Sequence, residues 1–135
     1  NNADIICAAT TSSTPVLRYQ DLKSGVHING VGSFQPSMQE IDSETIRNAL
    51  VFVDSRESAL SETGDLTIPI QEGIIGKNHL RAEIGELLEN PSLGRKTPDE
   101  ITFFKSCGVA VQDVVAAGMA LEQAKKNNLG RIIRM

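Results

Sequence analysis

Short apolar runs alternate with polar and amphipathic segments along this chain. Four runs have the length and the branched or aromatic content of strands covered on both faces: 4–9, 26–29, 50–53 and 101–104. Helical signals are found in three other segments: 44–48, 54–62 and 109–126. This order predicts an α/β fold, with a mainly parallel sheet of about four strands, flanking helices and a long C-terminal helix.

The remaining stretches carry weaker patterns. Residues 64–76 mix Gly, Pro and polar residues without a clear period, so we expect irregular backbone there, with a turn of helix near Glu72. Leucine and isoleucine recur at helical spacing over 80–88 and predict a helix that Pro91 ends. Residues 97–100 have the composition of a helix N-terminus, with proline at the first helical position.

Length and composition restrict the class of protein. The chain has 135 residues, enough for a single domain with a core, with 40% hydrophobic and 22% charged residues. Its net charge of −4 and its scattered acids argue against a nucleic-acid partner, because phosphate binding needs clustered Lys and Arg. No apolar run approaches the roughly 18 residues of a membrane span, and the N-terminus does not resemble a signal peptide. We therefore expect a cytoplasmic protein without a membrane partner.

The cysteines and histidines do not form a recognisable reactive or metal-binding set. Cys7 and Cys107 both lie in apolar stretches and are interpreted as small buried residues in a reducing compartment. A reactive thiol at Cys107 is the alternative. His27 stands alone in a strand, which is typical of a structural residue, and His79 has no acid or cysteine at ligand spacing. The sequence thus predicts no metal site.

Hydroxyl, amide and glycine residues follow three of the predicted strands. Thr10 and Thr11 follow the first strand, residues 29–33 close the second, and Lys105 with Ser106 ends the fourth. Ligands of open α/β sheets bind at the carboxyl ends of strands, so these groups are candidates for holding a ribose, a nicotinamide amide or an anion. The alternative is that the hydroxyls and glycines only form turns and that Lys105 is an exposed charge.

Two pairs of acids are candidates for acid–base chemistry. Glu83 and Glu86 share a face of a predicted helix, and Glu40 with Asp42 follows the glycine turn. Both pairs also suit a solvated surface, which is the commoner role. The sequence lacks a G-x-G-x-x-G phosphate cradle and the G-x-S-x-G nucleophile elbow of a hydrolase.

Longer motifs, in one order along nearly the whole chain, resemble the ornithine cyclodeaminase/mu-crystallin family. They lie at 3–12, at 25–32 (family pattern G-x-H-I-N-A-V-G), at 51–60, 62–66, 83–88 and 99–113. The resemblance implies a Rossmann-like NAD(P)-binding domain in a typically dimeric protein of about twice this length. Members of the family are cyclodeaminases, cyclic-imine (ketimine) reductases and amino-acid dehydrogenases.

The resemblance also implies roles for particular residues. The cofactor contacts of the family correspond to five positions of this sequence: Thr10, Thr11, Asn29, Val31 and Ser106. Lys105 would bind substrate beside the nicotinamide. The implied partners are NAD or NADP and a small amino acid or imine, and the implied assembly is a homo-oligomer.

Two departures from the family pattern decide which branch this chain resembles. Cyclodeaminases carry an Asp two positions after the Val-Gly pair, and Phe34 occupies that position here, which favours the reductase or dehydrogenase branch. The glycine-rich loop, the upstream substrate-binding residues and most of the dimerisation domain would precede Asn1. We therefore expect a fragment or truncated homologue of an imine reductase or amino-acid dehydrogenase, inactive alone and without cofactor binding of its own.

The resemblance divides the chain into two parts. Residues 1–108 would form the C-terminal part of the NAD(P)-binding domain, and 109–135 a helix and tail that pack on the dimerisation domain. A different hypothesis is a stand-alone binding or assembly module derived from the family. It would self-associate, because loss of the first strands exposes a sheet edge and an apolar face. The sequence leaves open the substrate, the choice between NAD and NADP, and the presence of activity.

Overall fold

Five parallel strands form one sheet in the computed structural model, which describes residues 2–131 and 133. The strands are β1 (Ile5–Ala8), β2 (His27–Gly30), β3 (Leu50–Val53), β4 (Leu80–Glu83) and β5 (Thr102–Lys105). Their order across the sheet is β1-β2-β5-β3-β4. The fold class predicted from the sequence is confirmed, with one strand more than expected.

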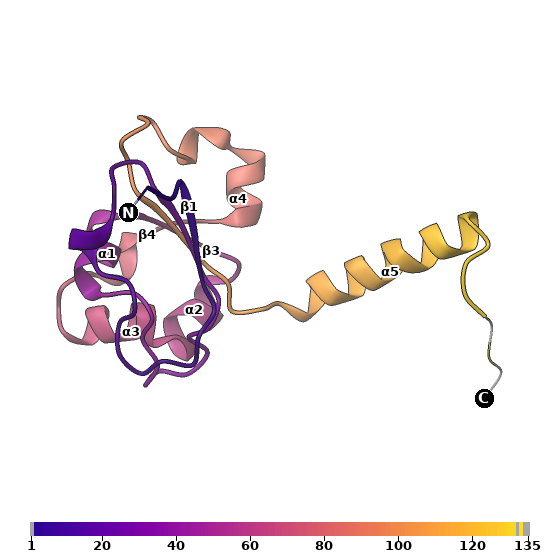
Figure 1. Cartoon of the computed structure of the whole chain (residues 1–135), viewed down its shortest axis with the longest axis horizontal. Helices are drawn as coiled ribbons and strands as arrows, with labels where there is room; N and C mark the ends of the chain where they lie inside the picture. Colours follow the sequence, from indigo (N-terminus) through magenta and orange to yellow (C-terminus); the bar gives the residue numbers. More distant parts are fainter. Residues whose placement is uncertain (1, 132, 134–135) are drawn as a thin grey trace.

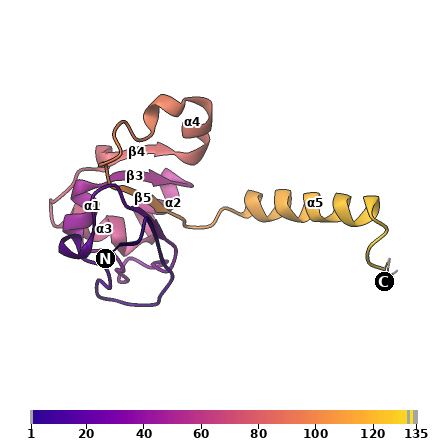
Figure 2. The ribbon, with the colours of Figure 1, turned by 45° about the horizontal axis from the view of Figure 1, so that its top comes forward.

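Most of the helices cover one side of this sheet and one of its edges, and the last one projects away from it (Figure 1). They are α1 (Ser43–Asn48), α2 (Arg56–Glu62), α3 (Gly64–Gln71), α4 (Ile84–Glu89) and α5 (Ala110–Lys126), with short 3-10 turns at Tyr19–Asp21, Lys77–His79 and Pro91–Leu93. Figure 1 shows α1 and α3 on one side of the sheet, and Figure 2 shows α4 at the edge formed by β4. Asp42 caps the start of α1, because its carboxylate accepts a hydrogen bond from the Thr45 amide at 2.9 Å.

The face of the sheet beneath α1 and α3 forms the hydrophobic core. Ile28 of β2, Phe103 of β5 and Val51 of β3 lie side by side in register and are fully buried. Ile46 of α1 and Leu66 of α3 belong to the same buried cluster. The apolar runs of the sequence thus supply this face, because every second residue of a strand points to the same side.

The opposite face of the sheet is open. His27 and Asn29 of β2, with Thr102 and Phe104 of β5, line a groove of about 920 Å³ that Leu87 of α4 flanks. His27 is half-buried whereas its two sequence neighbours are fully buried, so it faces away from them. The polar side chains of His27, Asn29 and Thr102 on this face make contacts within hydrogen-bond distance of one another. His27 and Asn29 stay partly exposed.

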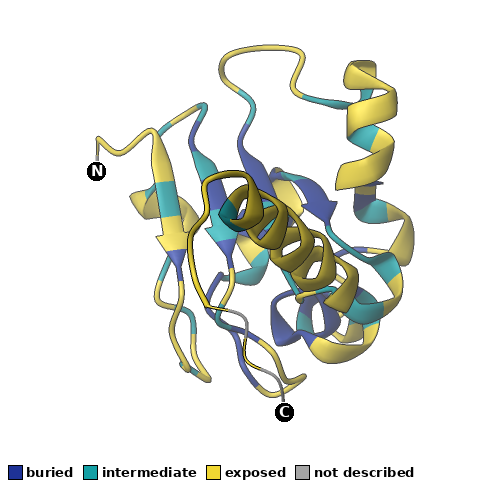
Figure 3. Cartoon of the chain, turned by 90° about the vertical axis from the view of Figure 1, so that its right-hand side faces the viewer, coloured by how far each residue is buried: buried dark blue, intermediate teal, exposed yellow. Residues whose placement is uncertain are grey.

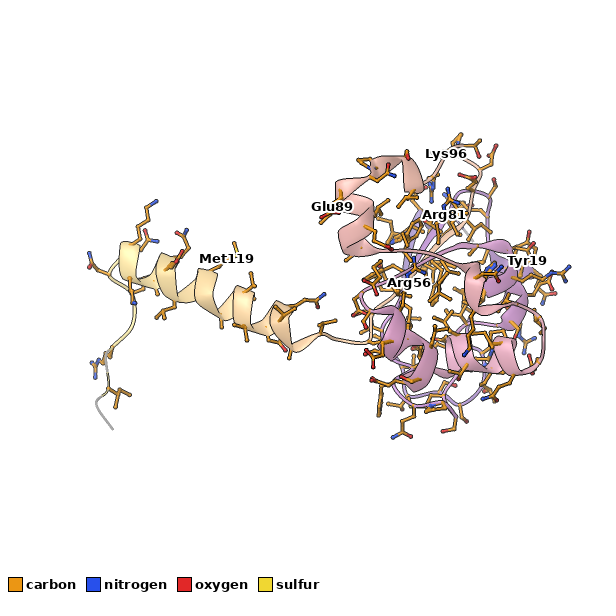
Figure 4. All side chains as sticks on the ribbon, turned by 180° about the vertical axis from the view of Figure 1, so that it is seen from behind. Tyr19, Arg56, Arg81, Glu89, Lys96 and Met119 are labelled. Atoms are coloured by element: carbon orange, nitrogen blue, oxygen red, sulfur yellow. The ribbon has the colours of Figure 1, made fainter. Side chains whose placement is uncertain are left out.

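The long helix α5 projects away from the body of the molecule, as Figure 1 shows, and Figure 3 shows that it is almost wholly exposed. The prediction of a helix at 109–126 is confirmed. Its apolar residues are exposed, including Val114 (70%), Val115 (54%) and Met119 (63%), and Figure 4 shows Met119 standing clear of the body. The end of the predicted tail, at 132 and 134–135, lies outside the described residues.

The predicted helix over 80–88 is wrong in its first half. Leu80 and Ala82 are buried and alternate with the exposed Arg81, and this strand pairs in parallel with β3. The helix α4 only follows it. A period of two over four residues therefore outweighs the helical spacing, because the edge of β3 offers a hydrogen-bonding partner.

The expectation of irregular backbone over 64–76 is also wrong, since α3 occupies most of that stretch. The helix forms despite Pro69 because it packs against α1 and α2 and buries Leu66. A Cβ at Gly64 would overlap the carbonyl of Met38, so glycine is required where the helix begins. Tertiary packing here overrides the composition on which the prediction rested.

Two further predictions need correction. Residues 97–100 form a turn rather than a helix start, and the Glu100 carboxylate accepts bonds from the Lys96 and Thr97 amides at 2.5 and 3.1 Å. The first strand is not covered on both faces, because β1 is an edge strand in which Ile5 is 64% exposed and Cys7 is exposed. An apolar run alone does not tell a central strand from an edge strand.

Candidate functional site

The carboxyl ends of β1, β2 and β5 meet at one edge of the sheet. Beyond the strands, the Val31 amide donates to the Ala8 carbonyl at 2.8 Å and the Ser106 amide donates to the Gly30 carbonyl at 3.0 Å. The Thr10, Val31 and Ser106 positions therefore follow adjacent strands in a row. We call the residues just after these three strands the rim.

Most of the predicted cofactor contacts lie on this rim. Thr10 and Thr11 are exposed, Val31 is 51% exposed and Ser106 is partly exposed. The Thr10 hydroxyl accepts a hydrogen bond from the Ser12 amide at 3.2 Å, so part of the hydroxyl-rich loop forms a turn, which was the alternative interpretation. The two interpretations are compatible, because a hydroxyl that accepts in a turn still carries a proton to donate.

Asn29 lies apart from the other predicted contacts. Its side chain is on the open face, where Oδ1 lies 3.2 Å from His27 Nε2 and Nδ2 donates to Cys7 Sγ at 3.6 Å. His27 Nδ1 lies 2.8 Å from the Thr102 hydroxyl, which also accepts from Arg95 at 3.0 Å. This chain of polar contacts runs across the groove and not along the rim.

Lys105, the predicted substrate residue, is fully buried beneath the rim. Its Nζ donates to the Gly30 carbonyl at 3.1 Å and lies 3.8 Å from Asp65 Oδ2, which is also fully buried. It is therefore not the exposed charge of the alternative interpretation. Burial lowers the pKa of Lys105, against the charge of Asp65, and burial raises the pKa of Asp65, against its backbone donors and the charge of Lys105.

A buried carboxylate joins two of the rim loops. Glu40 is fully buried; its Oε1 accepts from the Thr10 amide at 2.5 Å, and its Oε2 accepts from the Gly32 and Ser33 amides at 2.7 and 3.0 Å. A Cβ at Gly32 would overlap the backbone of Thr10, so the loops can approach this closely only with glycine there. The interpretation of Glu40 as part of a solvated surface is wrong.

A second carboxylate holds the loop that follows β5. Asp54 Oδ2 accepts from the Ser106 hydroxyl at 3.2 Å and from the Cys107 and Gly108 amides at 2.8 and 2.9 Å. Asp54 does not cap α2, since the Ser55 hydroxyl accepts from the Ser58 amide and begins that helix. The Ser106 hydroxyl donates to Asp54, so its oxygen is free to accept a bond from a ligand amide.

Cys107 is partly buried behind this loop. Burial, with Asp54 nearby, raises the pKa of the Cys107 thiol to about 11. A thiol with this pKa is almost wholly protonated near neutral pH, and only the thiolate is a nucleophile. The geometry therefore favours a structural cysteine over the reactive thiol that the sequence left open.

The other candidate acid pair has a structural arrangement. Glu86 accepts from the Glu83 amide at 2.7 Å and from Arg56 Nη2 at 2.9 Å, while Glu83 accepts from the Arg56 amide at 2.7 Å. These bonds cap α4 and join it to α2, and they lower the pKa of Glu86. Figure 4 labels Arg56 in this part of the body. The pair lies at the β4 edge, two strands from the rim at β5.

Sequence reasoning missed how three acids organise the rim. Glu40, Asp54 and Asp65 each accept at least two backbone amides from another segment of the chain, and Glu40 and Asp65 are fully buried whereas Asp54 is partly buried. Their local signal is weak, since Asp54 directly follows a strand, Asp65 follows a glycine, and Glu40 only comes after the glycine turn. That signal also describes helix caps and surface acids, so only the folded chain distinguishes them.

The rim residues offer both polar and apolar contacts to a ligand. An exposed apolar residue, Val31, stands between hydroxyl groups, which suits a flat ring that carries an amide. The described part of the chain contains no cluster of three His, Cys, Asp or Glu side chains suited to a metal ion. Within the same residues, no helix has the length and apolar character needed to cross a membrane.

Comparison with known proteins agrees with this class of site, an α/β domain of the type that binds nicotinamide cofactors. The chain belongs to the ornithine cyclodeaminase/mu-crystallin family, whose model matches residues 1–128. The resemblance found in the sequence motifs is thereby confirmed.

The similar proteins include members of the reductase branch. Δ1-pyrroline-2-carboxylate reductase of Bacillus cereus is 46% identical over 98% of this chain and 41% of its own length. The Thermococcus litoralis enzyme of that name, solved in complex with NADH and L-proline, is 39% identical with a TM-score of 0.91 over 98% of this chain and 41% of that one. An archaeal alanine dehydrogenase dimer with bound NAD is 35% identical, with a TM-score of 0.85 over 98% of this chain and 41% of that one. The chain thus spans about two fifths of the relatives that it matches.

Proposed function

We propose that this chain is part of an NAD(P)-dependent reductase that acts on a cyclic imine derived from an amino acid, such as Δ1-pyrroline-2-carboxylate. When bound, the cofactor supplies a hydride to the imine carbon while the imine nitrogen takes up a proton. The product is then a cyclic amino acid such as proline. The observation that carries the proposal is the row formed by Thr10, Val31 and Ser106 at one edge of the sheet.

The rim residues would hold the nicotinamide end of the cofactor. Thr10 and Thr11 offer hydroxyls, Val31 offers an apolar contact for the ring, and Ser106 offers an acceptor for the carboxamide. Asn29 would also contact the cofactor, from the open face of the sheet. The pyrophosphate would be held by residues that this sequence does not contain, because no glycine-rich cradle is present in it.

Lys105 is assigned to the substrate end of the same pocket. It ends β5 next to Ser106, and its ammonium lies under the Gly30 carbonyl. From there it would hold the Gly30 carbonyl and so the end of β2 that borders the substrate. Its burial distinguishes it from a surface lysine that would meet a substrate carboxylate directly.

Phe34 separates imine reduction from cyclodeamination in this proposal. It follows the rim loop at the position where the cyclodeaminase pattern has an acid, and it is 58% exposed. The phenyl ring of Phe34 has no ionisable proton to exchange with a substrate amine. The intact protein should therefore reduce imines and should not release ammonia from ornithine.

The rest of the intact protein would complete the pocket. We assign residues 1–108 to the NAD(P)-binding domain and 109–135 to a segment that packs on a dimerisation domain. The exposed apolar residues of α5 support this assignment, because such a stripe normally packs against a partner. We expect a cytoplasmic homo-oligomer.

The test is a comparison of substrates with the purified intact protein. Oxidation of NADH and of NADPH is followed by absorbance with Δ1-pyrroline-2-carboxylate, and with pyruvate plus ammonia as the dehydrogenase control. Ornithine with NAD tests cyclodeamination by release of ammonia. Rapid oxidation with the cyclic imine alone supports the proposal, and turnover of ornithine or no turnover of any imine contradicts it.

The second candidate is a self-associating module without activity. The observation that favours it is the combination of an exposed edge strand, in which Ile5 is 64% exposed, with the uncovered stripe of α5. Light scattering of the 135-residue chain at micromolar concentration is the test. A stable dimer without cofactor binding would favour this candidate, and a monomer would eliminate it.

A further inference from the structure

We propose that Glu40 is the positioning residue that sets the nicotinamide pocket of this protein, an inference that rests on the proposed function. Its carboxylate would hold the loop after β1 and the loop after β2 in one fixed arrangement. Glu40 does not itself reach the rim surface, because it is fully buried.

The two oxygens of Glu40 bind different loops. Oε1 accepts from the Thr10 amide at 2.5 Å, and Oε2 accepts from the Gly32 and Ser33 amides at 2.7 and 3.0 Å. The sheet itself joins these loops for the last time where the Val31 amide donates to the Ala8 carbonyl. Beyond the last hydrogen bond between the two strands, Glu40 therefore connects their loops.

A carboxylate is the group that this position requires. Three amide donors converge on it, and a carboxylate offers only acceptors, whereas a glutamine would turn an amino group toward one of the loops. A buried charge is tolerated only where such donors replace water. The close approach of Gly32 to Thr10 leaves no room for a water molecule to substitute, because even a Cβ would overlap there.

The same network reaches the third strand of the rim. Asp65 Oδ1 accepts from the Glu40 and Ile41 amides at 2.7 and 3.0 Å, and Asp65 Oδ2 lies 3.8 Å from Lys105 Nζ. Lys105 donates to the Gly30 carbonyl. The ends of β1, β2 and β5 are thus connected through one buried set of charges, with Glu40 as the member that touches both cofactor loops.

Asp42 provides a matched control two residues along the chain. It also accepts backbone amides, from Thr45 at 2.9 Å and Tyr19 at 3.2 Å, but it caps α1 and has no bond to the rim. Loss of its carboxylate removes a cap and lowers stability without moving the loops at Thr10 and Gly32.

The experiment compares Glu40→Gln, Glu40→Asp and Asp42→Ala in the intact protein. NADH binding is titrated by fluorescence, hydrogen exchange of the two loops is measured without cofactor, and steady-state kinetics give kcat and both KM values. We expect Glu40→Gln to weaken NADH binding about tenfold or more and to lower kcat up to about 100-fold, because a shift of the loops misplaces the reacting ring. The KM for the imine should change little, and only the Glu40 variants should exchange faster at Thr10 and Gly32.

If Glu40→Gln does not fold, Glu40→Asp provides the test of the proposal. It keeps the charge but is one methylene shorter, so it should fold and still weaken NADH binding. Glu40 variants that bind NADH as tightly as Asp42→Ala does overturn the assignment of Glu40 alone. A wild-type protein that binds no nicotinamide cofactor overturns the proposed function and this assignment together.

Discussion

The two faces of β5 show how differently one strand can be used. Phe103 is fully buried under α1 and α3, whereas its neighbour Phe104 is only partly buried and lines the open groove. Both are the same residue type on the same strand. Phe103 has its packing partners in α1 and α3, whereas Phe104 faces the groove, so the two rings contribute differently to the core.

The same contrast applies to polar groups. On the covered side, Lys105 and Asp65 are buried together and bonded to backbone groups. On the open side, His27 and Asn29 bond mainly to other side chains and stay partly exposed. Buried charges under the rim fix its geometry, whereas the polar groups of the groove can exchange their partners at lower cost.

The largest effect should come from the covered face. Phe103→Ala should lower the free energy of unfolding by about 3–5 kcal/mol, because it removes a fully buried ring and leaves a cavity. Urea denaturation of the intact protein measures it. Phe104→Ala is the matched control and should cost clearly less; equal losses would mean that both faces are covered to the same degree.

The next effect should come from the buried ion pair. Lys105→Met should cost about 3 kcal/mol at about pH 8, because it leaves the Asp65 carboxylate buried without its cation. The pKa of Asp65 is raised in the folded state, so the folded protein binds a proton on Asp65 more tightly than the unfolded chain does. The stability that this proton contributes is present at low pH and is lost as the pH rises through the folded-state pKa. Removing Lys105 raises the pKa further.

The pH dependence and a double variant check this prediction. The loss in Lys105→Met should shrink as the pH falls toward about 4, the ordinary value for Asp, because Asp65 then becomes neutral. Adding Asp65→Asn should restore much of the stability at about pH 8. A loss that is independent of pH would show that the methionine fits poorly and that the charge is irrelevant.

The two thiols provide a smaller but direct test of the same contrast. With a pKa of about 11, Cys107 should react with iodoacetamide far more slowly than the exposed Cys7 at about pH 8, since thiolate is the reactive form. Mass spectrometry of the labelled protein measures both rates. Rapid labelling of Cys107 in the folded protein would contradict the packing assigned to the loop after β5.

The smallest effect should come from α5. Val115→Ser should cost about 1–2 kcal/mol in the intact protein, because the apolar stripe of the helix would then be covered by another domain. Ala117→Ser, on a different face of the same helix, is the control. A change within about 0.5 kcal/mol for both variants would mean that α5 stays exposed and would remove the support for a packing domain.

Much of the fold and part of the site followed from local pattern. The strands β1, β2, β3 and β5 and the helix α5 were predictable because their apolar runs or helical spacing are long and regular. Thr10, Val31 and Ser106 were placed on one edge because parallel strands present their carboxyl ends together. Phe34 favoured the reductase branch through the resemblance to the family pattern, in agreement with the relatives found.

Only the tertiary structure decided where the buried charges lie and which strands are covered. Asp65 follows Glu40 by 25 residues and Lys105 follows Asp65 by a further 40, yet they meet beneath one rim. No local pattern encodes such contacts, because an acid beside a glycine looks the same at a surface turn and in the core. β4 and α3 were missed for a similar reason, since the partner that each packs against outweighs its own weak or ambiguous pattern.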